Sequence, residues 1–450
     1  MKAYLSVAVV LLLEICSAGL AHEPLWKAGA ARVAITPESP MWMSGYASRS
    51  HPADGKLQDL WCKVLVLEDA HGNRAALVTL DLVGIDRTTS LAVCDKIEEQ
   101  YNLTREQIAL CCSHTHSGPV VGDNLQTMYV LDSAQHQLVE DYTTRLKRQI
   151  VDVVGQAIAR LAPSRIAFAN GRATFAVNRR NNKEVDVPGL RARGKLLGPV
   201  DYDVPVLSVR DREGRLKAVA FGYACHATVL SSFQWCGDYP GYAQSTLEEL
   251  HPEAVALFWA GCGADQNPLP RREVSLAEQY GNDLAGAVDH VLNGVMRPIS
   301  GELTAAYAEV DLKLAELPTR AELQLQAISR DKYEAVRAQA LLRQIDAGQP
   351  LSPTYPYPVQ TWRFGNDLLW VTLGGEVVVD YALRLKGELG PSNTWVAGYS
   401  NDVMAYIPSR RVLLEGGYEG GGAMVYYGLP TTWAPEVEET IVHEVMRQQR

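Results

Sequence analysis

Three pairs of apolar segments, each joined by a short turn, predict β-hairpins. They are VLVLED with RAALVTLDL (64–82), PVLSVRD with RLKAVAFGYACH (205–226), and VQTWRFGN with DLLWVTLGGE (359–376). Each turn contains glycine, as is usual between neighbouring antiparallel strands. The second segment of each pair carries an ionisable side chain at its end, namely Asp81, His226 or Glu376. The hairpins therefore bring three candidate functional groups to strand ends.

Helical periodicity lies between these hairpins. Apolar residues recur three or four positions apart from Leu146 to Leu161, and Pro163 stops the pattern. A second apolar face runs from Leu276 to Leu292. Both patterns predict amphipathic helices that pack against the strands.

The rest of the chain extends this α/β pattern. A long charged helix is expected over 320–347, the following PLSPTYPYP predicts a rigid extended return, and 436–448 predicts a closing helix. The sequence as a whole predicts an α/β fold with mixed sheets, antiparallel hairpins and packed helices. We expect one large domain over residues 22–450, with a surface excursion at 320–360.

Residues 1–21 (MKAYLSVAVVLLLEICSAGLA) have the organisation of a signal peptide. Lys2 gives a positive start, an apolar run follows, and Gly19 and Ala21 are small residues near the expected cleavage point. The apolar run is shorter than a bilayer-spanning helix requires. The mature protein is therefore expected to be secreted or periplasmic.

Charge narrows the class of partner. The formal net charge is −10 and the isoelectric point is near 5.6, whereas nucleic-acid binding requires a positive field. We expect no nucleic acid as a partner, and a neutral or cationic small-molecule substrate fits this charge better.

Eight cysteines occur, and seven remain once residues 1–21 are removed. An odd number cannot all pair within one chain. Cys225 and Cys236 flank the loop that follows His226, so a disulfide between them is expected. Cys111 and Cys112 lie in an apolar strand, where at least one is expected to be a small buried side chain.

The segment SHTHSGP places two histidines just after the buried strand IALCC. On an extended backbone, side chains two residues apart share a face, so His114 and His116 are expected to point the same way. Gly118 and Pro119 then predict a turn. The alternative interpretation is a pair of surface histidines beside that turn.

Other strand ends carry groups that suit the same chemistry. Two or three imidazoles with one carboxylate form a common hydrolytic zinc site, with one position left for water. His226 and Glu376 follow apolar runs, and Tyr406 lies in TWVAGYSNDVMAYIP. The alternatives are an ordinary buried histidine, a glutamate in a salt bridge, and a core tyrosine.

Three further positions stand out. Asp81 is a candidate to orient a liganding histidine. Asp265 lies in the glycine-rich turn GCGADQNP, which suits close approach to a ligand. Glycines surround Tyr418 in GGYEGGGA, so this segment is either a wall of the site or an ordinary glycine-rich loop.

Taken in order, the motifs resemble the neutral/alkaline (non-lysosomal) ceramidases, which are secreted or surface zinc amidohydrolases. SHTHSGP is the most specific match. The others are Ile35-Thr36-Pro37, Gly45-Tyr46-Ala47, Asn178-Arg179, ACHAT around His226, Gly237-Asp238, Gly375-Glu376, Asn401 with Tyr406-Ile407, and Tyr418-Glu419-Gly420. The resemblance covers most of the chain after residue 21 and identifies it as a catalytic domain.

The resemblance implies roles for individual residues. His114, His226, Glu376 and Tyr406 match the zinc ligands, and His116 matches a candidate proton carrier. Arg179 and Tyr418 match residues that line the site near the scissile amide.

Two departures point to a diverged member of this family. Gly-Ala-Asp-Gln-Asn replaces a motif whose serine has a catalytic role, so Asp265 is expected at the serine's position, as a proton carrier or a ligand for a polar headgroup. The family also continues into a C-terminal immunoglobulin-like domain, whereas this chain ends soon after the Tyr418 motif.

The expected function is zinc-dependent hydrolysis of an N-acyl amide bond by a metal-activated water. The resemblance implies a ceramide-like or other N-acyl lipid substrate, with transient contact at a membrane surface. Two alternatives stay open: a zinc esterase or deacylase of a soluble substrate, and an exported binding protein without turnover.

Overall fold

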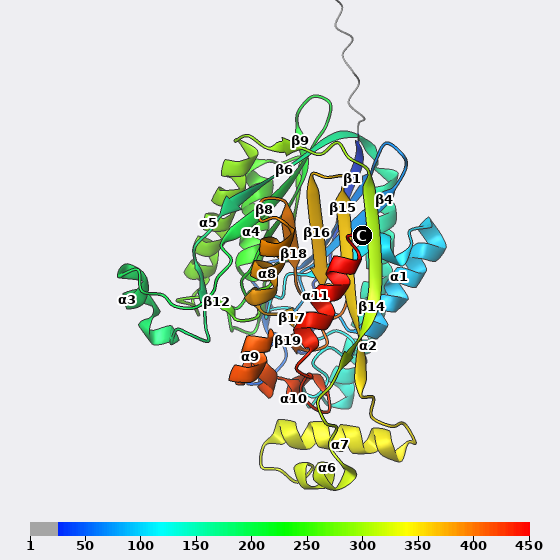
Figure 1. The fold of residues 1–450 in the computed structure, drawn as a ribbon, viewed down its shortest axis with the longest axis vertical. Helices are drawn as coiled ribbons and strands as arrows, with labels where there is room; N and C mark the ends of the chain where they lie inside the picture. Colours follow the sequence, from blue (N-terminus) through cyan, green and yellow to red (C-terminus); the bar gives the residue numbers. More distant parts are fainter. Residues whose placement is uncertain (1–25) are drawn as a thin grey trace, which may run out of the picture.

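The computed structural model describes residues 26–450 and has a mixed α/β fold, as the sequence predicts (Figure 1). The predicted signal peptide, residues 1–21, lies outside the described residues. Among residues 26–450, the helices are all too short or too polar to span a lipid bilayer.

The larger sheet has nine strands in the order β11-β9-β8-β6-β1-β3-β4-β5, with β13 paired to β6. Most neighbours are antiparallel, but β4–β5 and β9–β11 are parallel. The strands are β1 (Trp26–Ala34), β3 (Trp61–Glu68), β4 (Arg74–Leu80), β5 (Ile108–Cys112), β6 (Ala162–Arg172), β8 (Asp203–Arg210), β9 (Leu216–Tyr223), β11 (Val255–Ala260) and β13 (Arg297–Pro298).

A second sheet has four strands in the order β14-β15-β16-β18. They are β14 (Leu303–Lys313), β15 (Thr354–Phe364), β16 (Leu368–Leu373) and β18 (Thr394–Ala397). The three predicted hairpins are confirmed as the antiparallel pairs β3–β4, β8–β9 and β15–β16. The predicted extended return is also confirmed, because TYPYP forms the first half of β15 and pairs with β14.

The two sheets pack face to face and helices cover the opposite face of the larger sheet, so a central strand such as β3 is apolar on both sides. In β3, Leu65 and Leu67 lie in the core between the sheets together with Trp259 and Trp370. Val64, on the opposite face of β3, packs toward the helices. This alternation follows from the two-residue period of a strand.

Helices cover the outer faces of both sheets. Those on the larger sheet are α2 (Ser133–Ala159), α4 (Asp238–Leu250) and α5 (Val274–Leu292), with α1 (Arg87–Tyr101) packed on α2. The smaller sheet is covered by α8 (Val379–Leu389) and α11 (Val437–Arg447). The helices predicted from Leu146–Leu161, Leu276–Leu292 and 436–448 are confirmed as parts of α2, α5 and α11.

The excursion at 320–360 differs from its prediction as one long helix. It forms two helices, α6 (Arg320–Gln326) and α7 (Lys332–Asp346), below the sheets in Figure 1. The break occurs because the Asp331 carboxylate accepts hydrogen bonds from the backbone N–H groups of Tyr333 and Glu334, which starts a new helix. The Tyr333 hydroxyl donates to the Ala47 carbonyl at 2.6 Å and ties α7 to the domain.

Short elements gather at the end of the sheets where the candidate residues lie. The parallel pair β17 (Glu376–Val377) and β19 (Tyr406–Ile407) sets Glu376 beside Tyr406. The antiparallel pair β7 (Ala176–Asn178) and β12 (Gln266–Pro268) lies nearby (Figure 1). The remaining elements are β2 (Gly55–Lys56), β10 (Gln234–Trp235), α3 (Val187–Ala192), α9 (Arg410–Glu415), α10 (Met424–Tyr427), 3₁₀ turns η1 (Arg105–Gln107) and η2 (Glu184–Asp186), and the π-helical turn η3 (Tyr418–Gly422).

The predicted disulfide between Cys225 and Cys236 is wrong, because both thiols are free and buried. The Cys236 thiol instead donates to Oε1 of Gln58 and accepts from the Asp238 backbone N–H. Cys111 and Cys112 are buried apolar side chains of β5, as predicted.

Candidate metal centre

Four segments that are distant in sequence bring His114, His226, Glu376 and Tyr406 into one buried cluster. Oε2 of Glu376 lies 3.2 Å from Nε2 of His114 and 3.2 Å from Nε2 of His226. The Tyr406 hydroxyl lies 3.3 Å from Nε2 of His226. All four side chains are at most 4% exposed, so water does not solvate them.

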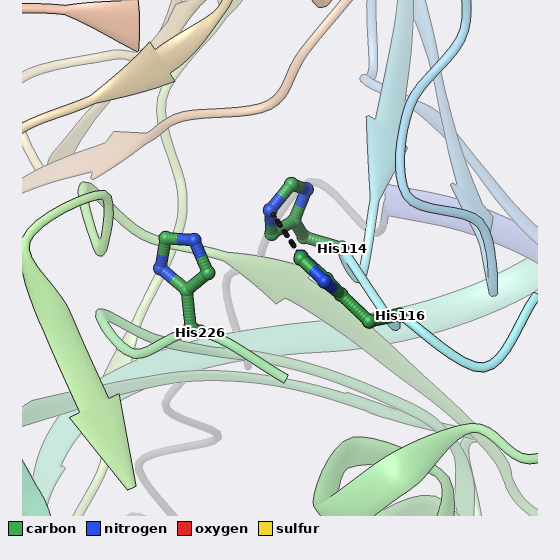
Figure 2. Close-up of side chains that lie close together, drawn as sticks. All are labelled: His114, His116 and His226. Carbon is green, nitrogen blue, oxygen red and sulfur yellow. Dashed lines mark hydrogen bonds between the residues drawn. The ribbon is translucent and has the colours of Figure 1, made fainter. Parts of the chain in front are cut away.

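The two histidines of SHTHSGP do meet, but not on an extended backbone as predicted. Strand β5 ends at Cys112, and His114 has a left-handed φ of 60°. The loop is held instead by a bridge between Thr115 and Ala227. Figure 2 shows the resulting cluster, in which Nε2 of His116 lies 3.1 Å from Nε2 of His114.

Backbone carbonyls fix the orientation of two imidazoles. Nδ1 of His114 lies 2.6 Å from the Val83 oxygen, and Nδ1 of His226 lies 2.8 Å from the Gly263 oxygen. A carbonyl oxygen can only accept, so both Nδ1 atoms carry the proton. Nε2 of each ring then faces Glu376.

Electrostatics keep the imidazole of His226 neutral. Burial lowers the pKa of His226 to about 4, and the nearby Arg179 lowers it further in the same direction. The Nε2 lone pair of His226 therefore faces a carboxylate oxygen without a proton between them, an arrangement that a bound cation stabilises. Donors at about 2.0–2.1 Å from one tetrahedral ion would lie about 3.3 Å apart, close to the observed spacings.

A third imidazole belongs to the same cluster. The ligand atoms of His114, His116 and His226 lie within 4.8 Å of one another, so these residues could hold a metal ion. Nδ1 of His116 is buried without a hydrogen-bond partner among residues 26–450. Burial, with the neighbouring His114, lowers the pKa of His116 well below its usual value. His116 is therefore neutral, and its Nδ1 is left without a partner inside the cluster.

The second oxygen of Glu376 has a partner that the sequence analysis missed. The Tyr427 hydroxyl, from α10, donates to Oε1 of Glu376. Nothing in the local sequence MVYYG distinguishes Tyr427 from Tyr426, so only the fold identifies this contact.

Arg179 connects the cluster to its surroundings. Its guanidinium donates to the Tyr406 hydroxyl at 3.1 Å, to Oε1 of Glu419 at 2.7 Å and to Oδ1 of Asn267 at 3.3 Å. Burial raises the pKa of Tyr406, and the positive charge of Arg179 opposes that rise. The Tyr418 ring lies 5.2 Å from the Tyr406 ring and is 44% exposed, so it stands between the cluster and solvent.

Asp265 lies near the cluster but is fully engaged by the protein itself. Its carboxylate accepts from the Val379 N–H and from the Asn178 amide, both at 3.0 Å, and its carbonyl accepts from the Arg179 N–H at 2.9 Å. These bonds favour a positioning role for Asp265, and the catalytic role predicted from sequence stays a prediction. The same loop orients His226 through the carbonyls of Gly263 and Gln266.

The expected role of Asp81 is wrong. Its carboxylate accepts from the Trp61 backbone N–H at 2.9 Å and from the Gln244 amide at 3.3 Å. Backbone carbonyls of Val83 and Gly263 take the place expected for a carboxylate beside the histidines. Asp81 therefore stabilises the end of β4 rather than the cluster.

Comparison with known families gives a match over half of the chain. Residues 26–261 match the family model described as neutral/alkaline non-lysosomal ceramidase, N-terminal. That range contains His114, His116, Arg179 and His226, whereas Glu376 and Tyr406 lie beyond it. No curated protein matches the chain.

Solved structures share the fold at low sequence identity. The neutral ceramidase from Pseudomonas aeruginosa superposes with a TM-score of 0.71 at 20% identity, over 95% of this chain and 75% of that one. A structure described as a ceramidase complexed with C2 gives a TM-score of 0.70 at 19% identity, over 94% of this chain and 76% of that one.

Proposed function

The chain belongs to the neutral/alkaline non-lysosomal ceramidase family, and from that premise we propose that it is a metal-dependent hydrolase of an N-acyl amide bond. The observation that carries this proposal is the position of Glu376 Oε2, 3.2 Å from Nε2 of both His114 and His226. Two buried imidazole nitrogens and a carboxylate oxygen that meet at one point form a donor set that suits a divalent cation.

We assign His114, His226, Glu376 and Tyr406 as the residues that hold Zn²⁺. When bound, this ion supplies a Lewis acid and lowers the pKa of a water from about 15.7 toward about 7. Tyr427 holds the carboxylate of Glu376, and Arg179 donates a hydrogen bond to the Tyr406 oxygen.

The side chains around the cluster supply the remaining steps. In amide hydrolysis the water oxygen bonds to the carbonyl carbon, the carbon–nitrogen bond breaks, and the departing nitrogen takes a proton. We assign His116 to carry that proton, and the 3.1 Å between its Nε2 and Nε2 of His114 supports this role. We assign Arg179 and Tyr418 to donate toward the carbonyl oxygen as it becomes negative, at about 3–4 kcal/mol for a well-placed donor.

The family name suggests a ceramide-like N-acyl lipid as substrate, with transient contact at a membrane surface. Such a substrate requires apolar surface along which its chains can lie. The signal-peptide pattern of residues 1–21 supports export, and we propose a secreted or periplasmic location.

Metal analysis combined with an amide-hydrolysis assay tests the proposal. We expect about one zinc per chain, loss of amine release after chelation, and recovery when zinc is added back. Glu376→Ala should lose both zinc and turnover, whereas the control Glu388→Ala changes a carboxylate on the surface of α8 and should keep both. A chain that binds no zinc, or Glu376→Ala that retains both zinc and activity, would contradict the assignment.

A further inference from the structure

A cavity of about 580 Å³ opens beside the candidate metal centre. Its walls come from residues 179–184, 267–271 and 415–419, three segments that follow or precede β7, β12 and η3. Arg179 and Tyr418 belong both to this cavity and to the surroundings of Tyr406. A volume of this size lies within the range of roughly 300–1,000 Å³ that is usual for small-molecule sites.

The walls of the cavity are polar, and their charges are paired except for that of Lys183. Glu419 accepts from Arg179 and Arg180, each at 2.7 Å, and Arg271 pairs with Glu184 at 2.9 Å. Leu269 is the only aliphatic residue among those that line the cavity. Burial of a methylene group contributes about 0.8 kcal/mol only where apolar surface covers it. This cavity therefore contributes little binding free energy to an acyl or sphingoid chain.

The same walls suit a hydroxylated ring. Sugar hydroxyls both donate and accept hydrogen bonds, and the guanidinium, carboxylate and amide groups of Arg180, Glu415 and Asn267 supply both kinds of partner. The half-exposed ring of Tyr418 offers an aromatic face for the C–H face of a sugar. Every arginine and glutamate of the walls is paired with another wall residue, so a ligand does not have to supply a charge to balance them.

We propose that this cavity binds the amine portion of the substrate and that this portion is a neutral, hydroxyl-rich ring, so that the enzyme removes an acyl group from an N-acylated amino sugar. The inference rests on the proposed function. With the ring in the cavity, the amide lies toward Arg179 and Tyr406. Water adds its oxygen to the acyl carbon, the carbon–nitrogen bond breaks, and the products are a carboxylate and a free amino sugar.

Two amides with the same acyl group test the substrate class. The zinc-loaded protein is assayed with the disaccharide of N-acetylglucosamine and with N-acetylsphingosine, which share an acetyl amide and differ in the amine. We expect kcat/KM for the disaccharide to be at least 100-fold higher. Faster hydrolysis of N-acetylsphingosine would overturn the inference and leave the proposed function intact.

Binding without turnover gives an independent measurement. Cellobiose has no amide, so its affinity for the zinc-loaded protein, measured by calorimetry, reports on the cavity alone. Tyr418→Ala should weaken cellobiose binding at least fivefold, whereas Tyr418→Phe keeps the ring and should bind normally while its amide hydrolysis falls. Lys183→Ala removes the wall charge that has no ion-pair partner within residues 26–450, and it should leave the cellobiose affinity within twofold because a neutral ligand does not need that charge.

The outcomes separate the two proposals. The neutral-ring assignment is overturned if Tyr418→Ala binds cellobiose as tightly as the natural protein does, or if Lys183→Ala strongly lowers the cellobiose affinity. Binding that depends on the Tyr418 ring, together with no hydrolysis of either amide by the zinc-loaded protein, overturns the proposed function and supports the assignment of the cavity.

Discussion

Tyr427 and Glu376 form a buried hydrogen bond in which the phenol donates to Oε1 of the carboxylate. This contact leaves Oε2 directed at Nε2 of both His114 and His226, at 3.2 Å from each. The hydroxyl therefore fixes the rotation of the carboxylate that completes the candidate metal centre, although Tyr427 is remote from Glu376 in sequence.

Tyr427→Phe should lower zinc affinity about 10–100-fold while the fold is retained, because partners that orient a ligand typically contribute that much. Titration of the protein in zinc buffers measures the change. Tyr426→Phe is the matched control, since the neighbouring ring packs on Tyr333 and Tyr418 and has no contact with the carboxylate. Equal zinc affinities for the two variants would show that Tyr427 does not position Glu376.

Arg179→Lys should reduce kcat/KM by roughly 100-fold with zinc content unchanged, because an ammonium cannot donate to Tyr406, Glu419 and Asn267 together. The control is Arg384→Lys, which changes an arginine of α8 that pairs with Glu388, Glu438 and Glu439 outside the cavity. Steady-state kinetics with metal analysis distinguishes the two variants. If both variants lose activity equally, the contact of Arg179 with Tyr406 is not the cause of the loss.

Asp265→Ser should destabilise the protein by about 1–3 kcal/mol and should not create a serine-dependent activity. The shorter side chain leaves the buried N–H of Val379 or the amide of Asn178 without its acceptor. Urea unfolding measures the loss, and Asp265→Asn, which keeps one acceptor, should lose less. A stable serine variant with increased turnover would place this position in the catalytic machinery.

Asp402 should make stability depend on pH. Burial raises the pKa of Asp402 to about 7. The Tyr355 hydroxyl, which donates to Oδ2 at 2.7 Å, and the positive charge of Arg87 oppose this rise. The negative charges of Asp86 and Glu309 add to it. A raised folded pKa contributes stability that is complete below the unfolded pKa of about 3.9 and is lost as pH rises through about 7. The loss is at most about 4 kcal/mol.

The variant Asp402→Asn removes this titration, so its stability relative to the natural protein should increase from pH 4 to pH 8. Urea unfolding at several pH values measures the difference. Asp186→Asn, at an exposed position of η2, should follow the natural protein throughout. Parallel curves for the natural protein and Asp402→Asn would mean that the buried carboxyl is ionised across this range.

The local pattern of apolar and polar residues was sufficient to predict the three hairpins and three of the helices. Apolar runs around glycine turns predicted the three hairpins because strand pairing through a short turn is a local event. Amphipathic periodicity predicted α2, α5 and α11 for the same reason. The charged pattern over 320–347 predicts one helix, but the Asp331 side chain caps and begins a second helix, α7, within this segment.

The candidate site was only partly accessible from sequence. Its residue types and strand-end positions singled out His114, His226 and Glu376, since a polar group after a buried run requires a partner. Other features of the site depend on segments that are far apart in the chain. They are the contact of Tyr427 with Glu376, the contact of the Gly263 carbonyl with His226, the free thiols of Cys225 and Cys236, and the hydrogen bonds of Asp265. Hydrogen-bond and metal geometry depends on distances between such segments, and these exist only once the two sheets have packed.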